Sequence, residues 1–171
     1  IFNNLTFTIN AGERIAVIGE NGVGKTTLLK LLMNEVQPQF GEIRWAEKAK
    51  PGYYSQDHSD LFKSETSLTD WIAEFVRAGG YEGGDVETLI RGTLGRLLFS
   101  GDEVKKPVNV ISGGEQGRML FGKLMLLHSN VLIMDEPTNH LDMESIESLN
   151  TGLEKFPGTL VFVSHDREFV S

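Results

Sequence analysis

A glycine-rich octapeptide, Gly19–Thr26, constrains the fold of this chain more than any other feature. It reads Gly-Glu-Asn-Gly-Val-Gly-Lys-Thr and fits the phosphate-binding loop pattern at each specified position. The run over 14–18 before it is short, apolar and β-branched, as in a buried parallel strand, and the run over 26–33 after it is rich in helix formers. A strand, a glycine-rich turn and a helix in this order predict an α/β fold that binds a nucleoside triphosphate.

The residue types of the loop suit an anion. Glycines allow the backbone to curl with its N–H groups pointing inward, and the following helix places its positive end against the same phosphates. Lys25 would reach the β- and γ-phosphates, and the Thr26 hydroxyl would ligate Mg²⁺. A glycine-rich turn that merely precedes a helix is the less favoured alternative. The residues expected to contact the nucleotide are Gly19, Glu20, Asn21, Gly22, Val23, Gly24, Lys25, Thr26 and Thr27.

Two carboxylates end a second apolar run, over 131–136. A parallel strand buried on both faces would deliver them to the carboxyl edge of the sheet. We expect Asp135 to hold Mg²⁺, through a water, and Glu136 to be the general base for the water that attacks the γ-phosphate. In isolation, an acidic pair opening a surface turn before Pro137 would be favoured. The phosphate loop upstream reverses that preference.

A short segment between these motifs, Ile111–Glu115, reads Ile-Ser-Gly-Gly-Glu before a helical stretch. A serine and glycines at a helix start can close on an anion, although such a sequence alone is more often a simple N-cap. The segment resembles the signature motif of the ATP-binding cassette (ABC) family, in which it binds the γ-phosphate of ATP held by an opposite domain. The resemblance implies ATP and Mg²⁺ as cofactors, and the signature residues Ser112, Gly113, Gly114 and Glu115.

Other positions match family motifs in order along the chain. Gln56 matches the Q-loop glutamine, which senses Mg²⁺ and the attacking water, so it is both a metal and a catalytic candidate. His165 follows the apolar run over 159–163 and matches the switch histidine that contacts the γ-phosphate. A lone glutamine or histidine would more often be an ordinary residue. The D-loop, which crosses to the partner domain, is matched by Asn139, His140, Leu141 and Asp142.

The segments over 135–142 and 164–169 are similar to the ABC-F class of soluble, tandem-cassette ATPases that act on ribosomes. The resemblance covers nearly the whole chain and implies ATP hydrolysis, weak for the isolated domain, with head-to-tail closure on a second cassette in the cytoplasm. Ile111 and Glu115 replace the leucine and glutamine of transporter signatures, and ABC-F proteins commonly carry that glutamate. The nucleotide-binding subunit of a membrane transporter is the main alternative. A nucleotide-gated binding module with negligible turnover is a third.

Charge bears on the ribosomal interpretation. With 16 Lys and Arg against 24 Asp and Glu, the net charge of −8 gives no general attraction to RNA. Any ribosome contact is therefore expected to be local or to lie outside this chain, and regions outside the chain are favoured. The absence of cysteine agrees with a reducing compartment. No apolar run approaches the ~20 residues that span a bilayer, so we expect no direct membrane insertion.

The expected fold is a P-loop NTPase of ABC-cassette type. We expect an α/β domain over 1–171 with a mostly parallel core sheet, an antiparallel β portion and a helical insertion at about 67–129. Short strands are expected at 5–9 and 41–45. The resemblance further implies that both ends are truncated, with an adenine-stacking aromatic before residue 1 and a strand and helix after 171. Helices are expected over 26–33, 68–76, 86–99, 115–127 and 143–155.

Overall fold

A computed structural model describes residues 2–81, 86–139 and 141–164. The chain divides into two compact units. The first, called here the sheet unit, comprises Ile1–Gln56, Ser129–Asn139 and Gly152–Ser171. The second, the helical unit, comprises Asp57–His128 and His140–Thr151. The expectation of a single domain with a helical insertion at about 67–129 stays a prediction.

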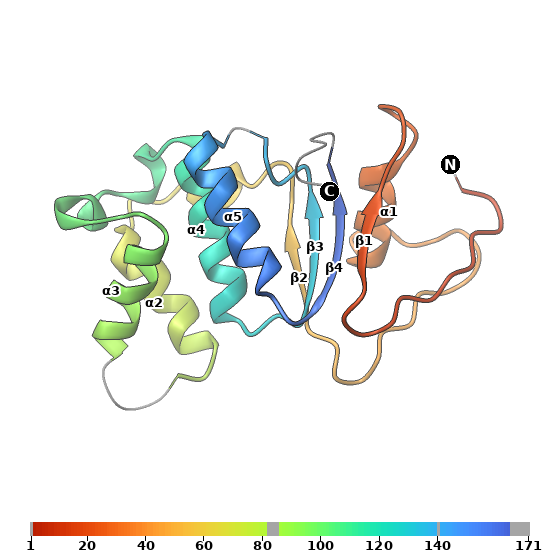
Figure 1. The fold of residues 1–171 in the computed structure, drawn as a ribbon, viewed down its shortest axis with the longest axis horizontal. Helices are drawn as coiled ribbons and strands as arrows, with labels where there is room; N and C mark the ends of the chain where they lie inside the picture. The colour runs from red at the N-terminus through yellow and green to blue at the C-terminus, as the bar shows by residue number, and fades with distance from the viewer. Residues whose placement is uncertain (1, 82–85, 140, 165–171) are drawn as a thin grey trace. The chain divides into compact units, whose positions relative to one another are not determined.

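The sheet unit is built on four parallel strands: β1 (Arg14–Val17), β2 (Pro51–Tyr54), β3 (Val131–Asp135) and β4 (Thr159–Val163). Their order in the sheet is β1-β4-β3-β2 (Figure 1). Val163 is paired with Val17 on one side and with Asp135 on the other. Because parallel strands all run the same way, their carboxyl ends meet at one edge.

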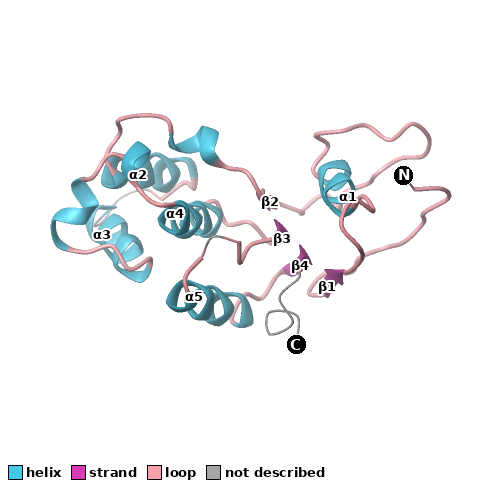
Figure 2. Cartoon of the chain, turned by 90° about the horizontal axis from the view of Figure 1, so that it is seen from above, coloured by secondary structure: helices cyan, strands magenta, loops and turns pink. Residues whose placement is uncertain are grey.

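Helix α1 (Lys25–Leu32) covers one face of this sheet (Figure 2). Its Leu29 is fully buried in a cluster with Ile133, Val161 and Val163. The intervening strand residues, such as Leu132 and Met134, are also fully buried. Burial on both faces explains why β3 and β4 read as continuous apolar runs rather than as alternating ones.

The helical unit contains α2 (Leu68–Ala78), α3 (Val86–Arg96), α4 (Gly113–Leu126) and most of α5 (Met143–Glu154). Three short 3₁₀ turns accompany them: η1 (Ser59–Phe62), η2 (Gly101–Lys105) and η3 (Val108–Val110). Leu68, Ile72 and Val76 are fully buried at the spacing of one helical face. Trp71 stacks on Phe62 with ring centres 5.1 Å apart. The helices expected from the apolar periodicity are thus confirmed.

The end of α3 differs from the expectation of a helix to Phe99. The helix ends at Arg96, because Leu98 takes a left-handed conformation with φ of 64°. The carbonyl of Leu94 then accepts from the N–H of Leu97 at 3.1 Å and from the N–H of Phe99 at 2.9 Å, which closes the end of the helix.

The strands expected at 5–9 and 41–45 are wrong, since both segments are irregular. Apolar residues in them, such as Leu5 and Trp45, remain 51% and 39% exposed. A strand is stabilised by ladder pairing, and alternating apolar residues cannot replace a hydrogen-bonded neighbour. The antiparallel portion of the sheet is therefore absent from the described residues, where antiparallel pairing is limited to a bridge between Ser67 and Pro107.

Among the residues that the structure describes, no helix combines the length and apolarity needed to cross a bilayer.

Candidate nucleotide site

The carboxyl edge of the sheet gathers segments that are far apart in the sequence. The phosphate loop follows β1, Gln56 follows β2 and Glu136 follows β3. Position 165 follows β4 and lies outside the described residues, as does His140. In open α/β sheets, ligands bind outside the carboxyl ends of the strands. This edge is therefore the candidate site.

The phosphate loop has the backbone that its glycines permit. Gly22 and Gly24 have φ of 81° and 110°, in the left-handed region that favours glycine. Gly24 precedes the first residue of α1, and its carbonyl accepts from the N–H of Leu28 at 2.9 Å. The N–H groups of the first turn, at Thr26 and Thr27, have no carbonyl one turn earlier within the helix to donate to. They are the donors that a phosphate would use.

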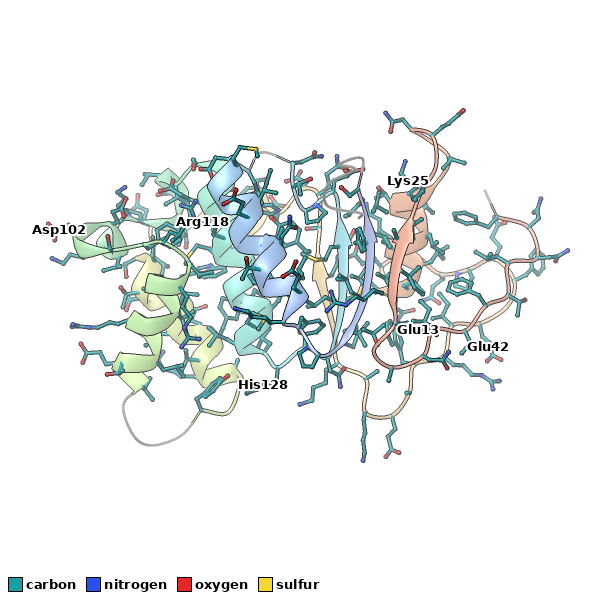
Figure 3. All side chains as sticks on the ribbon, viewed as in Figure 1. Glu13, Lys25, Glu42, Asp102, Arg118 and His128 are labelled. Atoms are coloured by element: carbon teal, nitrogen blue, oxygen red, sulfur yellow. The ribbon has the colours of Figure 1, made fainter. Side chains whose placement is uncertain are left out.

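Lys25 is buried, with 9% of its surface exposed, at the start of α1 (Figure 3). Its Nζ donates to the carbonyls of Gly19 at 2.9 Å and Glu20 at 3.0 Å. A cation is thus held inside the loop by neutral acceptors. Because a charged acceptor binds an ammonium group more strongly than a carbonyl does, a phosphate placed in the loop would compete well for it.

Asp135 ends β3 and is completely buried. Neither carboxylate oxygen has a hydrogen-bond partner in the described part of the chain. Buried charges are ordinarily paired or bound to a metal. No group of three or more His, Cys, Asp or Glu residues is placed to hold a metal within the described ranges. A single carboxylate, from Asp135, and the hydroxyl of Thr26 fit Mg²⁺ that arrives with the nucleotide. Proteins usually bind this ion through one or two carboxylates and substrate phosphates rather than through a cage of side chains.

Glu136 adopts a left-handed backbone, with φ of 50°, and is 8% exposed. Its N–H donates to the carbonyl of Val163 at 2.9 Å, and its carbonyl accepts from the N–H of Asn139 at 3.1 Å. These bonds hold a backbone conformation that non-glycine residues rarely adopt, and such strain is concentrated at functional sites. Next in the chain to Asp135, Glu136 is suited to orient water and accept a proton.

Tyr53 is a member of this site that the sequence analysis missed, because 51–54 was not recognised as a strand. Its aromatic run is a β signal that could have found it. Burial, followed by the charges of Asp135 and Glu35, raises the pKa of Tyr53, so the hydroxyl stays neutral. Gln56 lies exposed two residues beyond β2.

The signature residues begin α4 in the helical unit. The N–H of Glu115 donates to Oγ of Ser112 at 3.3 Å, and the N–H of Ser112 donates to Oε2 of Glu115 at 2.6 Å. This capping box is the simple N-cap that was weighed against an anion-binding role for the segment, and the structure contains it. Burial raises the pKa of Glu115, but the hydrogen bonds from Ser112 and the charges of Lys106 and Arg118 outweigh it, so the pKa is lowered overall.

The D-loop candidates divide between the units. Asn139 ends a segment of the sheet unit, whereas Leu141 and Asp142 belong to the helical unit. Asp142 caps α5, since its Oδ1 accepts from the N–H of Ser145 at 2.8 Å. The roles assigned to the site residues from sequence remain predictions.

Comparison with known proteins adds an independent line of evidence. Residues 2–139 match a family model described as ABC transporter. Over 171 residues the chain is 56% identical to "Probable ATP-binding protein YbiT" of Escherichia coli O157:H7, covering 100% of this chain and 31% of that protein. It is 41% identical to "ATP-binding cassette sub-family F member 3" of Rattus norvegicus, covering 99% of this chain and 23% of that protein. The chain thus spans about a third or less of these relatives.

Solved structures show the same fold. "RNase-L Inhibitor" matches with a TM-score of 0.73 and 26% identity, over 93% of this chain and 30% of that one. A complex of "archaeal ribosomal stalk protein aP1 and archaeal ribosome recycling factor aABCE1" matches with a TM-score of 0.75 and 26% identity, over 95% and 30%. "A putative metal-chelate type ABC transporter" matches with a TM-score of 0.77 and 26% identity, over 99% and 69%.

Proposed function

Because this chain belongs to the ABC family of ATP-binding cassettes, we propose that it is one ATP-hydrolysing half of an ABC-F protein. In this proposal the cassette closes head to tail on a second cassette and regulates translation on the ribosome. The full-length protein is cytoplasmic. The observation that carries the ATPase part is the buried carboxylate of Asp135, which has no hydrogen-bond partner within the described ranges and lies at the edge of the sheet where the phosphate loop follows β1.

In this proposal, each candidate site residue of the sheet unit has a distinct role. Mg²⁺, when bound with ATP, neutralises charge on the β- and γ-phosphates. Lys25 and the N–H groups of the first turn of α1 would bind the phosphates, while Asp135 and Thr26 would hold the metal. Glu136 holds the attacking water in line and accepts its proton. Gln56 contacts the same water and metal from the end of β2.

The second cassette is inferred from the signature. Ser112 and the glycines after it begin α4 with a capped, ordered turn, which suits the γ-phosphate of a facing nucleotide. Relatives about three times longer than this chain leave room for that partner. The segments over 91–99 and 115–123 favour the second cassette of a YbiT-like protein. Alone, the chain should be a monomer with weak ATP hydrolysis, because no second cassette brings a nucleotide to its signature or completes its own site.

The ribosomal role is supported by the relatives named as F-family members and by the fold shared with a ribosome recycling factor. The net charge of −8 gives no general attraction to RNA, so the RNA contacts are expected to be local or to lie outside this chain.

The test replaces Glu136 by glutamine, together with the equivalent glutamate of the other cassette, in the full-length protein. Glutamine keeps the shape but cannot take a proton, so hydrolysis should fall about 10²–10⁴-fold while ATP binding survives. The closed form should then sediment with purified ribosomes in ATP and not in ADP. Glu87→Gln is the control, because Glu87 is an exposed residue paired with Arg91.

Co-sedimentation that is absent, or equal with both nucleotides, would reject the ribosomal role and favour the transporter alternative. Hydrolysis that survives the substitution would reject the assignment of Glu136.

A further inference from the structure

An arginine in the second turn of α4, Arg118, is largely but not fully buried, although the chemistry described above does not use it. Its side chain is 16% exposed. Its Nε has no hydrogen-bond partner within the ranges that the structure describes. Burying a guanidinium is costly unless the rest of the group is well paired. Its remaining partners therefore indicate its role.

The guanidinium reaches from α4 to the start of α5 (Figure 3). Nη1 donates to Oγ of Ser145 at 2.7 Å and lies 3.9 Å from Oδ2 of Asp142. Ser145 is 2% exposed, so this hydrogen bond is sheltered from water. The Cζ of Arg118 also lies 5.2 Å from the centre of the Phe99 ring, within range of a cation–π interaction. All four residues belong to the helical unit.

Asp142 joins this contact to the D-loop, of which it is the last residue. Its Oδ1 caps α5 through the N–H of Ser145, and its carbonyl accepts from the N–H of Ile146 at 3.0 Å. The hydrogen bonds with Ser145, and then the charge of Arg118, lower the pKa of Asp142 against the opposing effect of burial. The end of the D-loop and the first turn of α5 are thus held together on Arg118.

Arg118 lies on the same helix as the signature, three residues after Glu115. Its charge is among the causes that lower the pKa of Glu115. The carboxylate of Glu115 accepts from the N–H of Ser112 and so orders the helix start. Because Arg118 and the signature lie on the same helix, the contacts of Arg118 with Ser145 and Asp142 tie the start of α4 to the end of the D-loop.

We propose that Arg118 is a positioning residue that fixes the spacing between the signature and the D-loop, the two segments that serve the second cassette. This inference rests on the proposed head-to-tail function. The planar guanidinium can donate toward Ser145 and Asp142 while its face lies on Phe99, which the single ammonium of lysine cannot do.

The test compares Arg118→Met and Arg118→Lys in the full-length protein with Lys123→Met as a matched control. Lys123 is a half-buried cation of the same helix, and its Nζ lies 5.0 Å from the centre of the Phe75 ring. The first measurement is hydrogen–deuterium exchange of the peptide 141–151 without nucleotide. We expect exchange about tenfold faster in Arg118→Met, an intermediate rate in Arg118→Lys, and no change in Lys123→Met. Unchanged exchange in Arg118→Met, or an equal change in the control, overturns the proposal.

The second measurement is steady-state ATP hydrolysis. Arg118→Met should lower kcat about tenfold and leave KM within about twofold, since the phosphate loop lies in the other unit and is untouched. A general loss of packing would change KM too, or appear equally in Lys123→Met, and either result overturns the proposal.

Hydrogen–deuterium exchange measured without nucleotide does not depend on ATP hydrolysis. The proposal for Arg118 and the proposed function can therefore be refuted independently. If Glu136→Gln still hydrolyses ATP while the exchange pattern is as expected, the proposed function falls and the tie between α4 and the D-loop stands.

Discussion

Asp135→Asn should make the nucleotide-free protein more stable while it removes Mg²⁺-dependent hydrolysis. The native carboxylate is completely buried, and neither oxygen is hydrogen-bonded within the described residues. The folded protein therefore carries the desolvation cost of this charge until Mg²⁺ offsets it. Asparagine has nearly the same shape and no charge, so the fold should be kept.

The expected gain in the free energy of unfolding is the difference between the cost of burying a charged group and the cost of burying a neutral polar one. An unpaired buried ion costs several kcal/mol, whereas a neutral polar group without partners costs about 1–3 kcal/mol. We expect the free energy of unfolding to rise by about 2 kcal/mol, which corresponds to about 4–8 °C in Tm for a domain of this size. Most substitutions of buried residues have the opposite sign.

The assay is thermal unfolding of the full-length protein in EDTA and again in Mg²⁺ with ATP. In EDTA the variant should unfold at the higher temperature. With Mg²⁺ and ATP, the native protein should gain binding stabilisation that the variant lacks, so the difference should shrink or reverse. Asp102→Asn is the control, since Asp102 is exposed and paired with Lys105, and its Tm should change little.

A variant that is less stable than the native protein in EDTA would refute the reasoning. It would mean that the Asp135 carboxylate is already compensated in the folded chain and that the site is not built to bind a cation.

Two further predictions concern the phosphate loop and the signature. Lys25→Ala should abolish Mg²⁺-ATP binding measured by calorimetry on the full-length protein, because no other cationic side chain lies in the loop to offset the γ-phosphate charge, and undiminished affinity would contradict the loop assignment. Glu115→Gln should lower the free energy of unfolding by about 1 kcal/mol at neutral pH, because it weakens the cap on α4. Since the folded pKa of Glu115 lies below its ordinary 4.5, this difference should be full above pH 4.5 and disappear as the pH falls through the lowered value. Denaturant unfolding at several pH values measures it, and a difference that does not vary with pH would contradict the ionised cap.

Short-range features were readable from the sequence. The loop at 19–26, the capped helix after Ser112 and the acidic end of β3 depend on residues within a few positions of one another, where glycine conformation, helix capping and apolar runs decide the structure. Helices α2 and α4 could likewise be predicted, because each presents an apolar face at helical spacing.

Long-range features were not readable. The order β1-β4-β3-β2, the role of β2 as a strand and the failure of 5–9 and 41–45 to form strands depend on which backbone lies alongside which. A strand exists only with a hydrogen-bonded neighbour, and a single sequence does not state its neighbours.

The site shows the same division. The sequence by itself determined that Lys25, Asp135 and Glu136 are present and that each has the chemistry of a nucleotide site. Only the tertiary structure decided that the Asp135 carboxylate has no hydrogen-bond partner among the described residues and that Arg118 reaches Ser145, because both facts depend on atoms brought together from distant parts of the chain. Residue types set the available chemistry, and packing sets which charges are paired and which are left for a ligand.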